Sequence, residues 1–118
     1  MNVKEVADIL QAQILTEGES LETDVVCACG SDLMSDVMAY VKENVLLLTG
    51  LVNPQVIRTA EMMDIKVIVF VRGKVPDKNI IELAKEKGIC VLSTRFSMFS
   101  ACGRLYNAGI KGEVFQGG

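Results

Sequence analysis

Polar and small residues gather at four points of the sequence where an apolar run ends, and these residues are the best placed to do chemistry. The four points are residues 30–32, 49–53, 72–74 and 93–97. The carboxyl ends of parallel strands form one edge of a sheet, where open α/β sheets bind ligands. A helix that follows a strand adds free N–H groups and the positive end of its dipole. The candidate ligand-binding residues are Ser31, Asp32, Thr49, Gly50, Asn53, Arg72, Thr94, Arg95 and Ser97.

The ligand that such a set favours is a small anionic metabolite or a nucleotide. Arg72 and Arg95 supply positive charge, and the hydroxyl and amide groups supply hydrogen bonds. The sequence contains neither GxGxxG nor GxxxxGK[ST], so neither common phosphate loop supports a bound cofactor. Glycine, serine, threonine and asparagine also build the ordinary turns and caps of α/β proteins. Turn chemistry without a ligand therefore stays open as the alternative.

Cysteine spacing raises a second kind of chemistry. Cys27 and Cys29 are two residues apart, so in a strand both thiols would lie on one face. With Cys90 and Cys102 they provide four thiolates, the number that a zinc or iron–sulfur site uses. The usual CxxC turn is absent, however, and free cysteine is among the residues most often buried. We expect core thiols and no metal, with thiol-based metal or redox chemistry as the alternative.

Catalytic chemistry has little support in the sequence. Histidine is absent from all 118 residues, which excludes Ser–His and Cys–His relays and any histidine-ligated metal. Asp32 and Asp36 share a helix face at i, i+4, a pattern typical of a solvated first turn that complements the helix dipole. We predict that no residue is catalytic and that the protein is not an enzyme.

The elements that must position these residues alternate between strand and helix. Apolar periodicity predicts helices over 3–10, 32–43, 54–63, 77–87 and 97–107, and strands over 14–15, 24–29, 45–48, 66–71 and 90–92. Ser31 or Asp32 is expected to cap the second helix, and Asn53 the third. The alternation predicts an α/β fold of three layers, α/β/α, with a mostly parallel sheet of about five strands. We expect one domain over 3–112 and a glycine-rich tail over 113–118.

Composition limits the partners. The net charge is −3, only 5% of residues are aromatic and tryptophan is absent, which disfavours nucleic acid. The longest apolar runs, 45–48 and 67–71, are far shorter than the roughly 20 residues that cross a bilayer. We therefore expect a cytoplasmic protein, with no membrane partner and reduced thiols. Half of the residues are hydrophobic, more than a small core needs, which favours a homodimer.

Four segments together resemble the DRTGG domain family. They are 24–37 (DVVCACGSDLMSDV), 45–50 (VLLLTG), 66–73 (KVIVFVRG) and 93–97 (STRFS), and the resemblance covers about residues 3–112. It implies a fold related to the N-terminal domain of HPr kinase/phosphorylase. Members of the family accompany CBS domains in regulated pyrophosphatases and occur in some phosphotransacetylases, where they contribute to dimerisation and regulation. Single-domain members lie near genes for iron-only hydrogenases, which implies a redox enzyme as partner.

The residues of the family name are only partly present. Thr49 and Gly50 match its Thr–Gly, and Asp32 corresponds to its aspartate, but Leu51 replaces the second glycine and the arginine position is not basic. The leading hypothesis is a non-catalytic, stand-alone regulatory or protein-interaction module that self-associates, with a metabolic or redox enzyme as partner. The alternative is a sensor that binds a small anionic metabolite or nucleotide at the strand ends.

Overall fold

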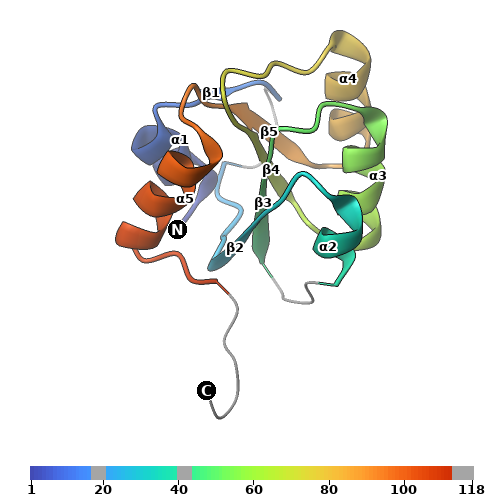
Figure 1. Ribbon diagram of the computed structural model, residues 1–118. Coiled ribbons are helices and arrows are strands. Elements are labelled where there is room, and N and C mark those ends of the chain that lie inside the picture. Colours follow the sequence, from blue (N-terminus) through green and yellow to red (C-terminus); the bar gives the residue numbers. More distant parts are fainter. Residues whose placement is uncertain (17–20, 40–43, 113–118) are drawn as a thin grey trace.

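One sheet of five strands, in the order β1-β5-β4-β3-β2, forms the middle of the structure (Figure 1). The computed structural model describes residues 1–16, 21–39 and 44–112, and all statements about structure concern these residues. The strands are β1 (Gln13–Ile14), β2 (Cys27–Gly30), β3 (Val45–Thr49), β4 (Val67–Phe70) and β5 (Cys90–Ser93). Strands β2 to β5 are parallel, and β1 pairs with β5 in the antiparallel sense.

Helices cover both faces of this sheet, which confirms the predicted three layers (Figure 1). One face carries α1 (Val3–Leu10) and α5 (Met98–Asn107). The other carries α2 (Met34–Met38), α3 (Pro54–Met62) and α4 (Lys78–Glu86). Each parallel crossover from β2 to β5 passes over this second face, as consecutive right-handed βαβ units do.

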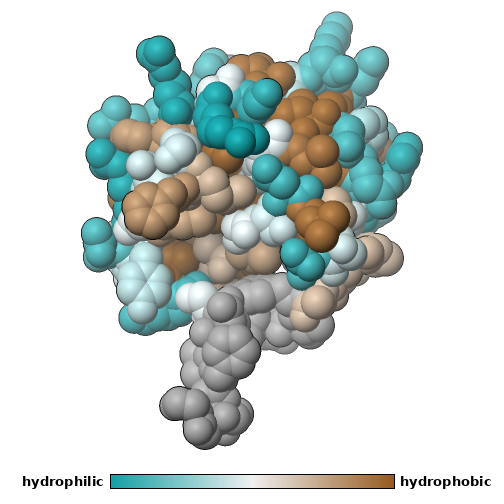
Figure 2. All heavy atoms as spheres, viewed as in Figure 1, coloured by the Kyte–Doolittle hydropathy of each residue, from teal (hydrophilic) through white to brown (hydrophobic). Residues whose placement is uncertain are grey.

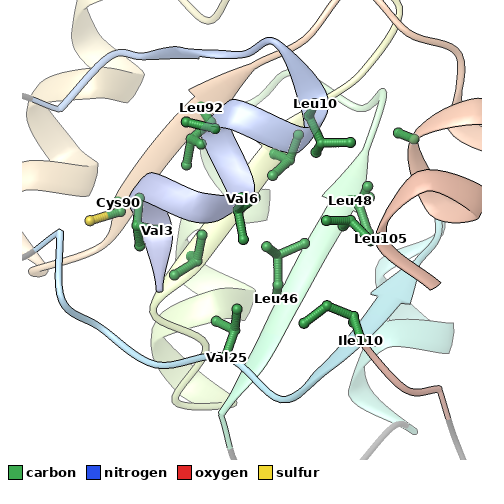
Figure 3. Packing of buried hydrophobic residues seen from close by; sticks show 14 of the residues in the cluster. Val3, Val6, Leu10, Val25, Leu46, Leu48, Cys90, Leu92, Leu105 and Ile110 are labelled. Atoms are coloured by element: carbon green, nitrogen blue, oxygen red, sulfur yellow. The ribbon is translucent and has the colours of Figure 1, made fainter. Parts of the chain in front are cut away.

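The central strands are apolar along their whole length because both of their faces are covered. In β3, Leu46 and Leu48 pack toward α1 and α5, whereas Leu47 packs toward α2 and α3. Their neighbours in register, such as Val67 beside Leu46, alternate in the same way. Figure 3 shows the first of these two cores, in which Val3, Val6 and Leu10 of α1 meet Leu46, Leu48 and Leu92 of the sheet.

Residues that favour a helix N-terminus stand at the starts of α1, α3 and α4, although Asn53, expected to cap α3, makes no side-chain hydrogen bond there. Asn2 caps α1, accepting a hydrogen bond from the Glu5 N–H at 2.9 Å while the Glu5 carboxylate accepts one from the Asn2 N–H at 3.1 Å. Pro54 takes the first position of α3, and the Asp77 side chain caps α4 at the Ile80 N–H.

The segment around α2 differs from the prediction. The helix spans Met34–Met38 rather than 32–43, and residues 40–43 lie outside the described residues. Leu33 occupies the N-cap position without a side-chain cap, so neither Ser31 nor Asp32 caps this helix as expected. Strand β2 also begins at Cys27 rather than 24, because Asp24 forms an antiparallel bridge with Asn2 instead.

Candidate functional site at the carboxyl ends of the strands

The carboxyl ends of β2, β3, β4 and β5 lie along one edge of the sheet. Register places Gly30 beside Leu48, Thr49 beside Phe70, and Phe70 beside Ser93. The loops that leave these ends carry the nine candidate residues, so the topology brings their backbones to one edge as the sequence predicted. The side chains, however, do not all meet.

The Asp32 carboxylate is the centre of the site. Its Oδ1 accepts a hydrogen bond from the Gly50 N–H at 2.6 Å and another from the Thr49 hydroxyl at 3.3 Å. Its Oδ2 forms an ion pair with Nη2 of Arg72 at 3.6 Å. One carboxylate therefore links the loops that follow β2, β3 and β4. This engagement explains why Asp32 does not cap α2, since its oxygens face the next strand rather than the helix.

The three groups around that carboxylate are of the kinds that bind an oxyanion. A backbone N–H, a hydroxyl and a guanidinium converge on it, and such charge-assisted donors bind carboxylate and phosphate oxygens strongly. The protein's own carboxylate fills the position. The side chains of Asp32 and Arg72 are both about half exposed, 51% and 52%, so the pair is open to water and to solutes.

Arg72 takes an unusual backbone conformation to reach this position. Its φ is +60°, in the left-handed region that non-glycine residues rarely occupy. The turn is held by two hydrogen bonds of 2.8 Å, from the Arg72 N–H to the Phe96 carbonyl and from the Gly73 N–H to the Thr94 carbonyl. The guanidinium lies across Gly50, where a Cβ would overlap it. Glycine at position 50 thus makes room for the arginine.

The remaining candidates are used by the fold in separate places. Thr94 is buried, and its hydroxyl donates to the Leu10 carbonyl at 2.7 Å. Ser31 accepts from the Leu33 N–H at 3.0 Å, and Ser97 caps α5 by accepting from the Ser100 N–H at 3.2 Å.

Asn53 and Arg95 do not hold their loops through side-chain hydrogen bonds of this kind. Asn53 is the N-cap residue of α3 but forms no side-chain cap, and its Oδ1 is buried without a hydrogen-bond partner. Arg95 is exposed at the same edge. The structure thus joins Asp32, Thr49, Gly50 and Arg72 through direct contacts and leaves the other candidates around them.

The four cysteines are divided between the two faces of the sheet. Cys27 and Cys29 belong to the core under α2 and α3, and Cys90 and Cys102 to the core under α1 and α5. A single ion cannot bind all four, so the four-thiolate alternative is wrong. In the described part of the chain, no three Cys, Asp or Glu residues are grouped so that they could hold a metal ion. Burial raises the pKa of the Cys102 thiol.

Sequence reasoning missed two contacts beside the site. The Arg104 guanidinium lies 4.0 Å from the centre of the Phe96 ring, which steadies the 94–97 loop. Met98 and Cys102 of α5 pack on Gly30, where a Cβ would lie 3.1 Å from the Met98 sulfur and 3.0 Å from the Cys102 sulfur. The i, i+4 spacing of these two sulfur residues was the signal available in the sequence.

Comparison with known families identifies the fold that carries this site. The model of the DRTGG domain matches residues 5–108, most of the chain. The chain belongs to the DRTGG domain family. In this DRTGG domain, the residues assigned to the family name through the resemblance, Asp32, Thr49 and Gly50, are in contact with one another.

A solved structure has the same fold. It is the regulatory region of Clostridium perfringens pyrophosphatase, comprising CBS and DRTGG domains, complexed with its activator diadenosine tetraphosphate. The TM-score is 0.69 at 19% sequence identity, and the match covers 93% of this chain and 47% of that one, so this DRTGG domain spans about half of its length. Comparison with curated protein sequences finds no match. No helix in the described ranges is long and apolar enough to cross a membrane.

Proposed function

We propose that this DRTGG domain is a non-catalytic regulatory and protein-interaction module that self-associates and serves a metabolic or redox enzyme. The observation that carries the proposal is the amount of apolar side chain left on the surface of the protomer. Large hydrophobic residues with more than half of their surface exposed are Leu33, Met62, Val75, Phe99 and Tyr106. Exposed apolar side chains that lie together mark interaction sites, and Phe99 and Tyr106 share one face of α5.

The state of the polar residues supports the same proposal. The hydroxyls of Thr49, Thr94 and Ser97 and the carboxylate of Asp32 are all engaged in hydrogen bonds that hold loops together. A nucleophile or general base needs a perturbed, available group within reach of a substrate. These groups hold the loops in place, so the strand ends are better suited to a structural role than to catalysis.

Native mass spectrometry of the purified protein tests the proposal, with sedimentation equilibrium across a range of concentrations. We expect a dimer of twice 12.8 kDa that persists on dilution and carries no small-molecule adduct. A monomer at tens of micromolar protein contradicts self-association. An adduct that is lost on denaturation favours the second candidate below.

The second candidate is a sensor for a small anionic metabolite or nucleotide, favoured by the oxyanion-binding groups around Asp32. A ligand phosphate that displaces this carboxylate would gain the Gly50 N–H, the Thr49 hydroxyl and the Arg72 guanidinium. Arg95, exposed at the same edge, would add a second positive charge.

Thermal denaturation with phosphate, pyrophosphate and diadenosine tetraphosphate tests the sensor. A ligand that binds only the folded state raises Tm by mass action. We expect Arg95→Ala to reduce the increase, and Arg58→Ala, a matched change on the exposed side of α3, to leave it intact. If Arg95→Ala leaves every increase unchanged, this site is not where the ligand binds.

A further inference from the structure

The outer face of α5 differs from that of every other described helix. Helices α1, α2, α3 and α4 each contain at least one acidic residue, whereas α5 (MFSACGRLYN) has none. Its inner face packs Ala101 and Leu105 into the core, and its outer face presents Phe99 and Tyr106, which are 89% and 66% exposed. Aromatic residues are enriched and carboxylates depleted in the centres of protein interfaces.

The charged side chain of this helix, Arg104, contacts the loop that precedes the helix. The Arg104 guanidinium stacks on Phe96, 4.0 Å from the ring centre, on the 94–97 loop. Lys111 lies 5.9 Å from the centre of the Tyr106 ring, at the edge of the face. This arrangement, an apolar centre with cations at its margin, is the usual anatomy of an interface.

Gly103 lies between the two aromatic residues and has no evident purpose within the protomer. It is inside α5, where glycine is the least favoured residue apart from proline. A Cβ at this position would meet nothing within 4 Å, so the fold of the protomer does not require glycine here. What glycine offers is a bare stretch of helix that another backbone can approach closely.

Phe99, Gly103 and Tyr106 make a self-complementary surface. Their spacing, four and then three residues, places them on one face of the helix. The order is large, small, large, nearly symmetrical about Gly103. When two such helices cross in opposite directions at the glycine, each Phe99 meets Tyr106 of the partner subunit. A surface that complements itself is the requirement for a two-fold dimer.

The face continues onto the edge of the sheet. A hollow of about 80 Å³ between α5 and β2 is lined by Gly30, Cys102, Tyr106 and Lys111, among others. Figure 2 shows hydrophobic residues gathered on the surface over α5 and β2. Two largely exposed aromatic side chains offer roughly 250–400 Å² of contact. That is about a third to a half of the roughly 800 Å² that each partner contributes to a standard interface.

We propose that the outer face of α5 is the homodimer interface, with two copies of the helix crossing in opposite directions at Gly103. The inference rests on the proposed self-association and adds the surface that performs it. Because the face is self-complementary in shape and its aromatic centre carries no charge, its occupant is a second copy of this chain.

Sedimentation equilibrium of four proteins tests the interface. They are the wild type, Gly103→Ala, Phe99→Ser and Met62→Ser, the last a matched control that removes an exposed apolar side chain from α3. We expect Gly103→Ala and Phe99→Ser to raise the dimer dissociation constant at least about tenfold, and Met62→Ser to leave it unchanged.

The Gly103→Ala variant also separates an interface from a structural role. Alanine favours helix more than glycine does, so the dissociated protomer should melt at the same temperature or higher even though the dimer weakens. As a second measurement, Gly103→Cys treated with a mild oxidant should form a covalent dimer. The wild type, whose Cys102 packs on Gly30, should not form one under the same treatment.

Two outcomes overturn the inference, and they differ from each other. If the wild type is a dimer and neither Gly103→Ala nor Phe99→Ser changes its dissociation constant, another surface forms the dimer and the proposed function stands. If the wild type is a monomer at tens of micromolar, the proposed self-association itself is wrong.

Discussion

Replacing Asp32 with alanine removes the carboxylate that links three strand ends. The resulting loss in the free energy of unfolding can be worked out from the contacts of that carboxylate. The Gly50 N–H loses a charged acceptor at 2.6 Å and Arg72 loses an ion pair at 3.6 Å. A hydrogen bond to a charged group contributes about 1.5–3 kcal/mol, and an exposed ion pair about 0.2–1 kcal/mol. Because both side chains are about half exposed, water replaces part of this. We expect a loss of about 1–2 kcal/mol in the free energy of unfolding.

That loss corresponds to a measurable change in Tm. Unfolding entropy of about 2.1 cal/mol/K per residue gives about 0.25 kcal/mol/K for 118 residues. Asp32→Ala should therefore lower Tm by about 4–8 °C in circular dichroism melts. The control is Asp36→Ala, an equal change of charge on the exposed side of α2. If the two variants melt within a degree of each other, the Asp32 contacts do not stabilise the fold and the reasoning is refuted.

Three further changes test other parts of the structure. Arg72→Gly should melt about 4 °C above Arg72→Ala, because glycine tolerates a φ of +60° that costs alanine about 1 kcal/mol; equal melting temperatures would contradict this strain. Cys102 should be alkylated more slowly than a free thiol at pH 8, as peptide mass spectrometry can show, because its raised pKa favours the neutral thiol. Because the folded protein holds the Cys102 proton more tightly, the contribution of this thiol to the free energy of unfolding is constant at neutral pH. It falls once the pH rises past the pKa of the thiol in the unfolded chain. Leu47→Ala, at a fully buried site, should lower the free energy of unfolding by about 2–5 kcal/mol in urea titrations without changing the m-value.

The sheet and its covering helices could be predicted because local signals and tertiary packing agree there. The run 45–48 is apolar on both faces and became β3, an interior strand of the sheet. Pro54 marked the start of α3, and Gly88, at a φ of +71°, follows the end of α4 as expected. Two predicted caps are exceptions: Asp32, expected to cap α2, binds the neighbouring strand end instead, and Asn53 stands at the N-cap of α3 without a side-chain hydrogen bond. A local rule for caps contains no information about that long-range contact.

The location of the candidate site could be predicted from the sequence, but the side-chain contacts within it could not. Topology alone brings the four loops to one edge, so alternation of strands and helices was enough to find it. Which side chains meet there depends on backbone details that no pattern shows, such as the left-handed turn at Arg72. The cysteines show the same limit, because a sheet between Cys27 and Cys102 is invisible in their spacing.

The joining of the first residues to the last strand has a consequence for synthesis of the chain. The Thr16 hydroxyl accepts from the Val91 N–H, and the Thr94 hydroxyl donates to the Leu10 carbonyl, across 75 and 84 positions. While a ribosome is still making residues before 90, β1 has no strand to pair with, and the apolar edge of β4 is uncovered. A nascent chain of this length would expose an unpaired sheet edge, and such edges are prone to aggregation. Truncated or slowly translated versions should therefore need a chaperone far more than the finished domain does.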